Sequence, residues 1–410
     1  MNKRKTSRFT YFIMSVSIIA IFVSGCYLYY HFKHLNEEDP LTIQDRKQQR
    51  QAHTAEKSQE IKPLETIVDQ QNPVFNTIDR YLESVQFNGT IAVFENGHLK
   101  MDKGYGYQDF EKQKKNSPNT VYLIGSAQKF LTGIIVKKLE LENKIHVEDS
   151  VSTYIPDFQL PQDVTIKDLL MHQSGFYKYQ GSDDISDLDG AIKAIEAIEA
   201  RGIDPKFYHK HFYNDANYLV LAKVIENVTG QSYVQNYYRY IGNPFRLMHT
   251  SFFDDERYKE DMAKGYRLDK KTHNVVFREP HYLNQYYGAG NLYMSAHDMG
   301  VLVRKLQTNR VFPEKITLPY IHEFMTPRYP EKYRYGFYVY NNFNRINGIF
   351  FGQIFTTYYN DKYIIVLGTN YDQPKPNNNE ARIKHIYFDI LNQHAIINQP
   401  GITVPVPKSS

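Results

Sequence analysis

The chain has 410 residues, which suits one large catalytic unit with a tail, or about two to three ordinary domains. Hydrophobic residues make up 41% of the chain and charged residues 23%, which excludes a disordered polymer and a polytopic membrane protein. The net charge of +4 equals the four bases of residues 1–8. Residues 1–72 hold ten of the 49 bases and eight of the 45 acids, which leaves 39 bases against 37 acids for residues 73–410. This balance gives no support to nucleic-acid binding.

The first 32 residues predict a membrane anchor. The basic flank at residues 1–8 precedes an apolar run over residues 9–32, and about 20 apolar residues suffice to cross a bilayer as a helix. A basic flank stays in the cytoplasm, so the rest of the chain is expected on the cell-wall side of the cell membrane. Two alternatives stay open. The run Val23-Ser24-Gly25-Cys26 resembles a lipobox, which would make the protein a lipoprotein anchored at Cys26, and a cleaved signal peptide would release it.

Three segments follow the anchor. Residues 33–72 are rich in Gln, Glu, Lys and Asp without apolar periodicity, which predicts a flexible spacer. Residues 73–395 carry the periodic patterns of a folded unit and form the predicted catalytic domain. Residues 396–410 contain three prolines and are expected to form a loose C-terminal tail.

The strand patterns lie at the two ends of the predicted domain. Residues 89–95 and 98–106 flank Asn96-Gly97, the pair typical of a type I′ hairpin. Aromatic and β-branched residues predict further strands over residues 333–340, 349–359 and 363–369, followed by a closing helix over residues 381–393. The middle of the chain is helical in pattern. We therefore predict an α+β fold, with an antiparallel sheet built from both chain ends and flanked by helices, plus a mostly helical lobe.

Ser126 and Lys129 form the first candidate site. They lie three residues apart at the start of a helical pattern, so their side chains share one helix face. A serine hydroxyl becomes a nucleophile when a neighbour takes its proton, and a lysine that is desolvated enough to be neutral can do so. The positive end of the helix would stabilise an oxyanion formed there. Alone, the pattern is more typical of Ser126 as a helix N-cap with a solvated Lys129.

Two further motifs favour the chemical interpretation. Tyr213-Asn214-Asp215 precedes a helical pattern over residues 218–228 that Gly230 ends, and a tyrosine hydroxyl on such a turn can relay protons to or from a serine. Residues 345–349 lead into a strand, where Gly348 would let a substrate lie beside the backbone. The joint occurrence of these motifs makes a mere helix cap at Ser126 an inadequate explanation.

The order of the three motifs resembles the layout of serine β-lactamases and penicillin-binding proteins. Residues 165–175 and 288–292 are similar to that superfamily's turn between lobes and to its active-site floor. The resemblance implies a β-lactamase-like fold. We interpret His172, within the first of these stretches, as structural, because a lone histidine in an apolar stretch is more often a satisfied core group than a catalyst.

A closer resemblance connects residues 74–393 with the D-alanyl esterases of this superfamily that act on teichoic acids. It is carried by residues 104–112, 123–130, 285–294 and 383–387. It implies that Ser126 is the acylated nucleophile and Lys129 its base, with Tyr213 and Asp215 as the partner box. Asn347, Gly348 and Ile349 would bind the substrate, and the backbone N–H groups of Ser126 and of a residue near Ile349 would hold the oxyanion.

Two departures from the usual penicillin-binding pattern indicate the substrate. The third motif, which is called the third box and comprises residues 346–348, has Ile346 where a lysine or histidine normally helps to hold a free carboxylate. The second motif, called the second box and comprising residues 213–215, ends in Asp215 instead of asparagine. A D-alanyl ester has no free carboxylate but has a free ammonium, which a carboxylate and tyrosine rings can bind. In the alternative interpretation, Arg345 replaces the missing cation.

The resulting hypothesis is an extracytoplasmic serine esterase that removes D-alanyl esters from teichoic acids. Its expected partners are D-alanylated teichoic acids, the cell membrane and, weakly, β-lactams. No cofactor and no metal are expected, since the sequence has neither an HExxH pattern nor a Cys/His cluster. The alternatives are a DD-carboxypeptidase or low-affinity penicillin-binding protein acting on peptidoglycan, and a non-catalytic scaffold that binds teichoic acid.

Overall fold

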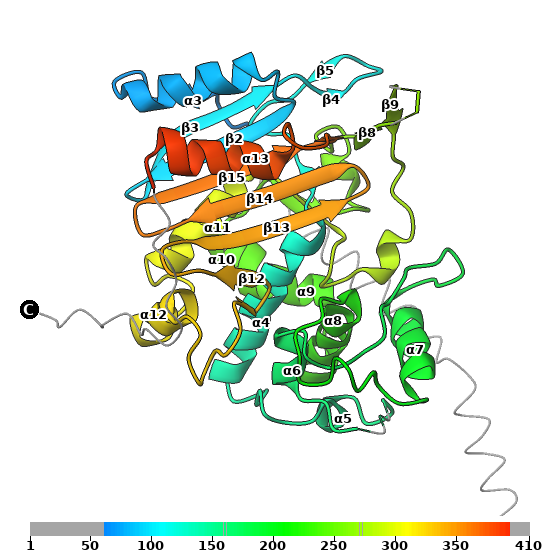
Figure 1. Cartoon of the computed structure of the whole chain (residues 1–410). Coiled ribbons are helices and arrows are strands. Elements are labelled where there is room, and N and C mark those ends of the chain that lie inside the picture. Colours follow the sequence, from blue (N-terminus) through cyan, green and yellow to red (C-terminus); the bar gives the residue numbers. More distant parts are fainter. Residues whose placement is uncertain (1–60, 159, 161, 270, 273, 394–410) are drawn as a thin grey trace, which may run out of the picture. The chain divides into compact units, whose positions relative to one another are not determined.

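A central antiparallel sheet joins the two ends of the domain in the computed structural model, which describes residues 61–393 except 159, 161, 270 and 273 (Figure 1). Its eight strands run in the order β1-β3-β2-β15-β14-β13-β12-β11. The strands are β1 (Ile67–Val68), β2 (Gly89–Glu95), β3 (His98–Tyr105), β11 (Tyr333–Arg334), β12 (Phe337–Val339), β13 (Asn344–Phe350), β14 (Gln353–Tyr359) and β15 (Tyr363–Thr369). Because β2 pairs with β15, the predicted sheet from both chain ends is confirmed.

The predicted hairpin at Asn96-Gly97 is also confirmed. β2 and β3 pair in an antiparallel register, and Asn96 and Gly97 have φ values of 47° and 75°. A type I′ turn requires positive φ at both central residues, which asparagine and glycine tolerate better than other residues.

Two of the predicted strands are broken. The run over residues 333–340 turns at Tyr335 (φ 49°) and Gly336 (φ 88°), so that β11 and β12 form a short hairpin. The run over residues 349–359 turns at Phe351 (φ 44°) and Gly352 (φ 78°), which separates β13 from β14. Both turns put an aromatic residue of high strand propensity in the left-handed region, so the pattern of residue types concealed them.

The N-terminal edge of the sheet reaches into the segment expected as a spacer. β1 pairs with β3, and the N–H of Asp69 donates to the carbonyl of Lys100 over 2.8 Å. The side chains of the same two residues form an ion pair at 2.9 Å. Residues 61–72 therefore belong in part to the folded unit.

Helices cover both faces of the sheet (Figure 1). On one face, α3 (Pro73–Ser84) and α13 (Asn379–Lys384) bury an apolar cluster that includes Phe75, Leu82 and Ile383. The closing helix differs from its predicted bounds, since α13 continues as a π-helical turn over His385–Ile390. On the other face, α11 (Ala296–Gln307) packs against β2 and β15.

A mostly helical lobe, as predicted, continues the second face. It contains α4 (Gln128–Leu141), α5 (Val151–Tyr154), α6 (Ile166–Leu170), α7 (Leu188–Glu199), α8 (Asp215–Thr229), α9 (Tyr233–Tyr237), α10 (Asn243–Phe245) and α12 (Glu314–His322). The smaller sheets are formed by β4 (Tyr107–Asp109) and β5 (Lys114–Lys115), by β6 (Tyr122–Leu123), β10 (Leu292–Met294) and β7 (Thr250–Phe252), and by β16 (Tyr371–Asp372), β8 (Tyr266–Leu268) and β9 (Val275–Phe277). Within the lobe, α4 packs against α8 and α9 and is buried on nearly every side.

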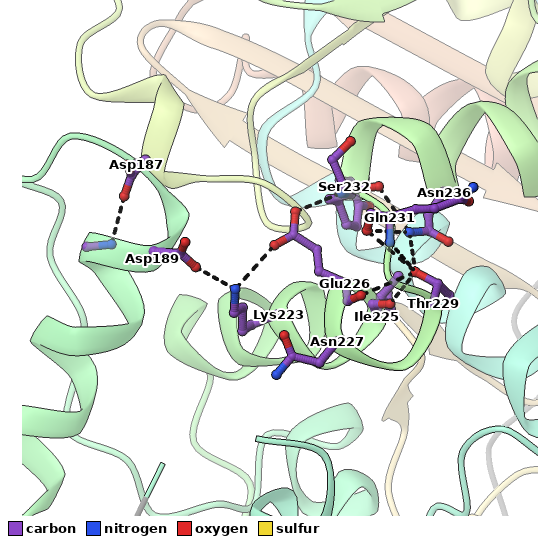
Figure 2. Close-up of polar contacts among 12 residues, drawn as sticks. Asp187, Asp189, Lys223, Ile225, Glu226, Asn227, Thr229, Gln231, Ser232 and Asn236 are labelled. Carbon is purple, nitrogen blue, oxygen red and sulfur yellow. Dashed lines mark hydrogen bonds and ion pairs between the residues drawn. The ribbon is translucent and has the colours of Figure 1, made fainter. Parts of the chain in front are cut away.

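Polar contacts fix α7 and α9 to α8 (Figure 2). Lys223 on α8 pairs with Asp189 of α7 at 2.6 Å. The side-chain amide of Asn236 on α9 donates to the Thr229 hydroxyl at the end of α8 over 2.8 Å. These bonds hold the helix whose first residue is Asp215.

Within residues 61–393, the structure has no helix that is long and apolar enough to span a bilayer. The predicted anchor at residues 9–32, Cys26 and the tail at residues 396–410 lie outside the described residues.

Gly133 should be essential for the packing of α4. A Cβ at this position would lie 2.6 Å from the carbonyl carbon of Tyr335. Gly133→Ala would therefore push the backbone of α4 away from the backbone of Tyr335. Although alanine gains up to about 1 kcal/mol in helix propensity, overpacking costs about 1–3 kcal/mol, and we expect a net loss of stability in urea unfolding. The control Gly190→Ala meets first a flexible methyl of Ile185 at 3.1 Å and should change stability less. Equal effects of the two substitutions would contradict the tight contact.

Candidate active site

Ser126 lies in a short 3-10 helix, Gly125–Ala127, that connects β6 to α4. The N-cap of α4 is Ala127, and no side chain caps this helix end, so the capping interpretation of Ser126 is wrong. The Ser126 hydroxyl instead accepts a hydrogen bond from the Lys129 ammonium over 3.0 Å. The spacing of three residues thus brings the two side chains together as predicted.

Lys129 is completely buried and uses all of its donors. Its Nζ donates to the Ser126 Oγ at 3.0 Å, to Asp215 Oδ1 at 2.7 Å and to the Ala289 carbonyl at 3.1 Å. Three acceptors match the three N–H bonds of an ammonium group.

The charge state of Lys129 follows from these partners. Burial by itself lowers the pKa of Lys129, but the Asp215 carboxylate and the Tyr213 hydroxyl act in the opposite direction and leave the pKa raised. Lys129 is therefore an ammonium in the resting site at neutral pH. This differs from the neutral lysine predicted from the sequence, because burial alone favours the neutral form and the Asp215 carboxylate reverses its effect.

Tyr213 lies over the same ammonium. Lys129 Nζ is 5.1 Å from the centre of the Tyr213 ring and 5.8 Å from that of Tyr218. Burial raises the pKa of Tyr213, and the charge of Lys129 and a hydrogen bond with Ser126 oppose the rise. A protonated phenol in contact with both Ser126 and Lys129 is placed to pass protons between them.

The turn before α8 positions Asp215. Asn214 is the N-cap of α8 and accepts the N–H of Ala216, while its amide donates to the carbonyls of Phe176 and Tyr177 at 2.9 Å and 2.7 Å. Asp215 follows as the first helical residue, where the helix dipole favours a carboxylate. Its side chain is 31% exposed, so the carboxylate meets solvent on one side and Lys129 on the other.

β13 lies against the nucleophile turn because Gly348 has no side chain. A Cβ at Gly348 would lie 2.8 Å from the Ser126 nitrogen and would collide with the Ile124 carbonyl. A Cβ at Gly125 would lie 3.1 Å from the backbone of Ile349. The backbone N–H groups of Ser126 and Ile349 thus belong to two closely packed segments, as an oxyanion hole requires.

The side chain of Asn347 has a different position. Its Oδ1 accepts a hydrogen bond from Thr356 of β14 over 2.8 Å, and Thr356 in turn accepts one from Asn379 at the start of α13. Alternate residues of a strand face opposite sides of the sheet. Asn347 therefore faces α13, while Gly348 faces Ser126.

The third box has no cation at the site. Ile346 is completely buried in the apolar core that includes α4. Arg345 binds Glu380 through Nε at 3.1 Å and Nη2 at 3.0 Å. Since Glu380 belongs to α13, Arg345 points away from Ser126, and the alternative in which it replaces the missing cation is wrong.

His172 lies in the core, as predicted, but it is not fully satisfied, because its buried Nε2 has no hydrogen-bond partner among the described residues. Its Nδ1 accepts hydrogen bonds from the Asn217 amide at 2.8 Å and the Asn214 N–H at 3.3 Å. Its ring lies 4.3 Å from the ring of Tyr213, centre to centre. His172 thereby supports the turn that carries Tyr213 and Asp215.

Two groups at the site were not among the predicted site residues. The Ala289 carbonyl binds Lys129, and the Gln128 side chain accepts the N–H groups of Asn291 and Leu292 at 2.6 Å and 3.0 Å. The segment 288–292 was identified as the floor of the site. Only the folded backbone shows which of its carbonyls faces Lys129.

The stability of the protein should depend on the neutral state of His172. Burial, with the nearby charge of Lys129, lowers the pKa of His172 well below 6.5. Below pH 6.5 the unfolded chain binds a proton at His172 that the folded chain does not, so this residue destabilises the fold as pH falls, by up to about 1.4 kcal/mol per pH unit. In urea unfolding, the free energy of unfolding of His172→Gln should fall less than that of the wild type as the pH is lowered from about 7.5 to 5.5. Identical pH dependence would contradict a neutral His172.

Comparisons with known proteins agree with this geometry. Residues 74–387 match the beta-lactamase family. Teichoic acid D-alanine hydrolases of Staphylococcus aureus strains NCTC 8325 / PS 47 and COL are 54% identical to the chain over 341 residues, which cover 83% of this chain and 84% of the relatives. The crystal structure of FmtA from Staphylococcus aureus superposes with a TM-score of 0.81 at 52% identity and covers 87% of this chain and 99% of FmtA. A penicillin-binding protein homologue from Pyrococcus abyssi, at 22% identity and a TM-score of 0.65, covers 79% of this chain and 78% of its own and shows the fold alone. The chain therefore belongs to the beta-lactamase family, and within it to the relatives of the teichoic acid D-alanine hydrolases.

Proposed function

We propose that the protein is an extracytoplasmic serine hydrolase that removes D-alanyl esters from teichoic acids through an acyl-enzyme at Ser126, and so modulates the charge of the cell envelope. The observation that carries this proposal is the contact of Lys129 with both Ser126 (3.0 Å) and Asp215 (2.7 Å), in a chain 54% identical to relatives named teichoic acid D-alanine hydrolase. A second-box carboxylate beside the catalytic pair suits a substrate that carries an ammonium.

Substrate binding would prepare the base. The resting Lys129 is an ammonium, so it must lose a proton before it can accept one from Ser126. The ammonium of a D-alanyl ester placed at the exposed side of Asp215 competes with Lys129 for this carboxylate and adds a like charge nearby. Both effects lower the pKa of Lys129, and its proton would leave to solvent through the partly exposed Asp215 carboxylate, to which Lys129 donates.

Acyl transfer would follow in two steps. Neutral Lys129 takes the Ser126 proton as Oγ attacks the ester carbonyl, and the N–H groups of Ser126 and Ile349 stabilise the oxyanion. The bond between the acyl carbon and the polyol oxygen then breaks. The leaving oxygen takes the hydroxyl proton of Tyr213, and the protonated Lys129 gives its proton to Tyr213. Water then attacks the D-alanyl carbonyl as neutral Lys129 takes one of its protons, the bond to Oγ breaks to release D-alanine, and Lys129 returns the proton to Ser126.

The positions of Ile346 and Arg345 also favour an ester that carries an ammonium over a substrate that carries a carboxylate. In a carboxylate-binding enzyme of this superfamily the third box supplies a cation, and here Ile346 is buried in the core and Arg345 is bound to Glu380. We therefore place peptides that end in D-alanine, and the DD-carboxypeptidase alternative, second. β-Lactams, which also carry a carboxylate, are proposed as weak acylating agents. The backbone of Gly348 and Ile349 contributes to binding, and Asn347 acts through the sheet.

The proposed domain organisation places this chemistry at the cell surface. Residues 1–8 remain cytoplasmic, residues 9–32 anchor the chain in the membrane, and residues 73–395 form the catalytic domain. Residues 33–72 act mainly as the spacer, and residues 396–410 as the tail. Lipidation at Cys26 remains the alternative form of anchoring.

Two substrates separate the proposed function from its alternatives. The full chain and its Ser126→Ala variant are each given D-alanylated teichoic acid and a peptide that ends in D-Ala-D-Ala, and the free D-alanine is measured. We expect release from the teichoic acid, lowered by more than about a thousandfold in the variant, because the nucleophile is lost. Cleavage of the peptide alone would favour the carboxypeptidase, and no release from either substrate would favour the scaffold.

Asp215→Asn tests both roles of the carboxylate. Loss of a charge-assisted bond to the substrate ammonium should lower kcat/KM for a D-alanyl ester about ten- to a hundredfold. With an uncharged acetyl ester, the acid limb of the pH–rate profile should move to lower pH, because Asp215 raises the pKa of Lys129. The matched control Asp189→Asn removes a carboxylate that also pairs with a lysine, Lys223, and should leave both measurements unchanged. An unchanged esterase rate in Asp215→Asn would remove Asp215 from the mechanism.

A further inference from the structure

A cavity of 390 Å³ lies beside the C-terminal half of α4. Its walls come from α4, α6, α12, the loop at residues 147–148 and the segment over residues 328–335. Lys137, on its wall, is eight residues from Lys129, which corresponds to about 12 Å along the helix. The mechanism described above uses none of the residues that line this cavity.

The cavity carries an excess of positive charge. Four cationic side chains and two acidic ones line it, a balance of +2, and they are Lys137, Lys167, Arg328, Arg334, Glu140 and Glu148. The two acids are already engaged, because Lys137 pairs with Glu140 at 3.0 Å and Lys167 pairs with Glu148 at 2.8 Å. Arg328 pairs at 3.6 Å with Glu323, which lies outside the lining, so Arg334 is the cation of the lining without an acidic partner among the described residues.

Arg334 is the more unusual of the two arginines. Its side chain is completely buried, and Nη2 donates to the backbone carbonyls of Pro319, Tyr320 and Glu323 at 3.3 Å, 2.9 Å and 2.6 Å. Nε and Nη1 have no hydrogen-bond partner among the described residues, and the guanidinium lies 4.0 Å from the centre of the Tyr329 ring. Burial lowers the pKa of Arg334 to about 10. A buried cation without a carboxylate is costly, and an anion in the adjoining cavity would offset the cost.

We propose that this cavity binds a phosphate group of a polyol phosphate chain. Arginine forks bind phosphate oxygens in pairs, lysines add long-range attraction, and the apolar and aromatic part of the lining suits the carbon chain of a short polyol. The inference rests on the proposed function, since a teichoic acid is a polyol phosphate polymer and supplies many such groups. It adds a second contact for the polymer, separate from the one at Ser126.

The segment that carries Arg334 also supports the catalytic residues. The ring of Tyr333 lies 5.8 Å from that of Tyr213 and 4.7 Å from that of His172. The backbone of Gly336 packs against the backbone of Lys129. A phosphate in the cavity would thus lie beside the strand pair that packs on the active site, and it would keep the polymer attached between successive cleavages. Tethering of this kind raises the effective concentration of the next ester.

The test uses the two cations of the cavity that solvent can reach, the half-buried Lys167 and the exposed Arg328. Arg334→Met would release three carbonyl contacts and is expected to disturb folding, so the test variant is Lys167→Ala/Arg328→Ala in the full chain. The control, Lys259→Ala/Arg267→Ala, removes one lysine and one arginine from other ion pairs, those with Glu256 and Asp372. Isothermal titration with glycerol phosphate should show saturable millimolar binding to the wild type, the control and Ser126→Ala. The test variant should bind at least about tenfold more weakly, which corresponds to 1.4 kcal/mol.

The kinetic arm separates this inference from the proposed function. The test variant should have a higher KM for D-alanylated teichoic acid and an unchanged kcat/KM for a monomeric D-alanyl ester. Glycerol phosphate binding that is absent from the wild type, or equal in the test variant and the wild type, would overturn the phosphate site even if the esterase is active. Absence of esterase activity with intact, cavity-dependent binding would overturn the proposed function and leave the phosphate site standing.

Discussion

The buried ammonium of Lys129 requires neutralisation, and the architecture around it meets this requirement from three distant parts of the chain. Asp215 comes from the start of α8, the carbonyl of Ala289 from the floor segment, and Ser126 from the turn before α4. An unpaired buried charge costs several kcal/mol, so none of these segments can move away without a large penalty. The geometry of the nucleophile is therefore maintained by the same contacts that satisfy the charge.

Neutral polar groups hold the surroundings of this ion pair. Asn214 binds two carbonyls of the loop at residues 176–177, and His172 accepts from Asn217 and from the backbone of Asn214. Tyrosine rings fill the remaining space beside Lys129, which gives part of the high tyrosine content a function in the resting site. Cation–π contacts are predicted from the sequence for the substrate ammonium, whereas in the structure two tyrosine rings lie against Lys129 of the protein itself.

Local patterns were sufficient to predict part of the fold and site. The hairpin at Asn96-Gly97 follows from residue types that favour positive φ, and the pairing of Ser126 with Lys129 follows from helical spacing. The turns at Tyr335 and Phe351 were missed because aromatic residues in the left-handed region carry no signal of a turn. The charge state of Lys129 was also missed, because it depends on Asp215, a residue 86 positions away along the chain. Properties set by neighbours along the chain were accessible, and those set by long-range contacts were not.

The saturated hydrogen bonding of Lys129 has a consequence for chemical selectivity. A serine whose partner lysine is fully protonated is a poor nucleophile, so the resting site is expected to react slowly with electrophiles that leave this charge state unchanged. In the proposed mechanism, the ammonium of the D-alanyl ester lowers the pKa of Lys129, so the substrate promotes its own cleavage. If the proposed mechanism holds, covalent inhibitors that carry an amine close to the reactive carbonyl should acylate Ser126 faster than neutral or acidic ones, because only the amine lowers the pKa of Lys129.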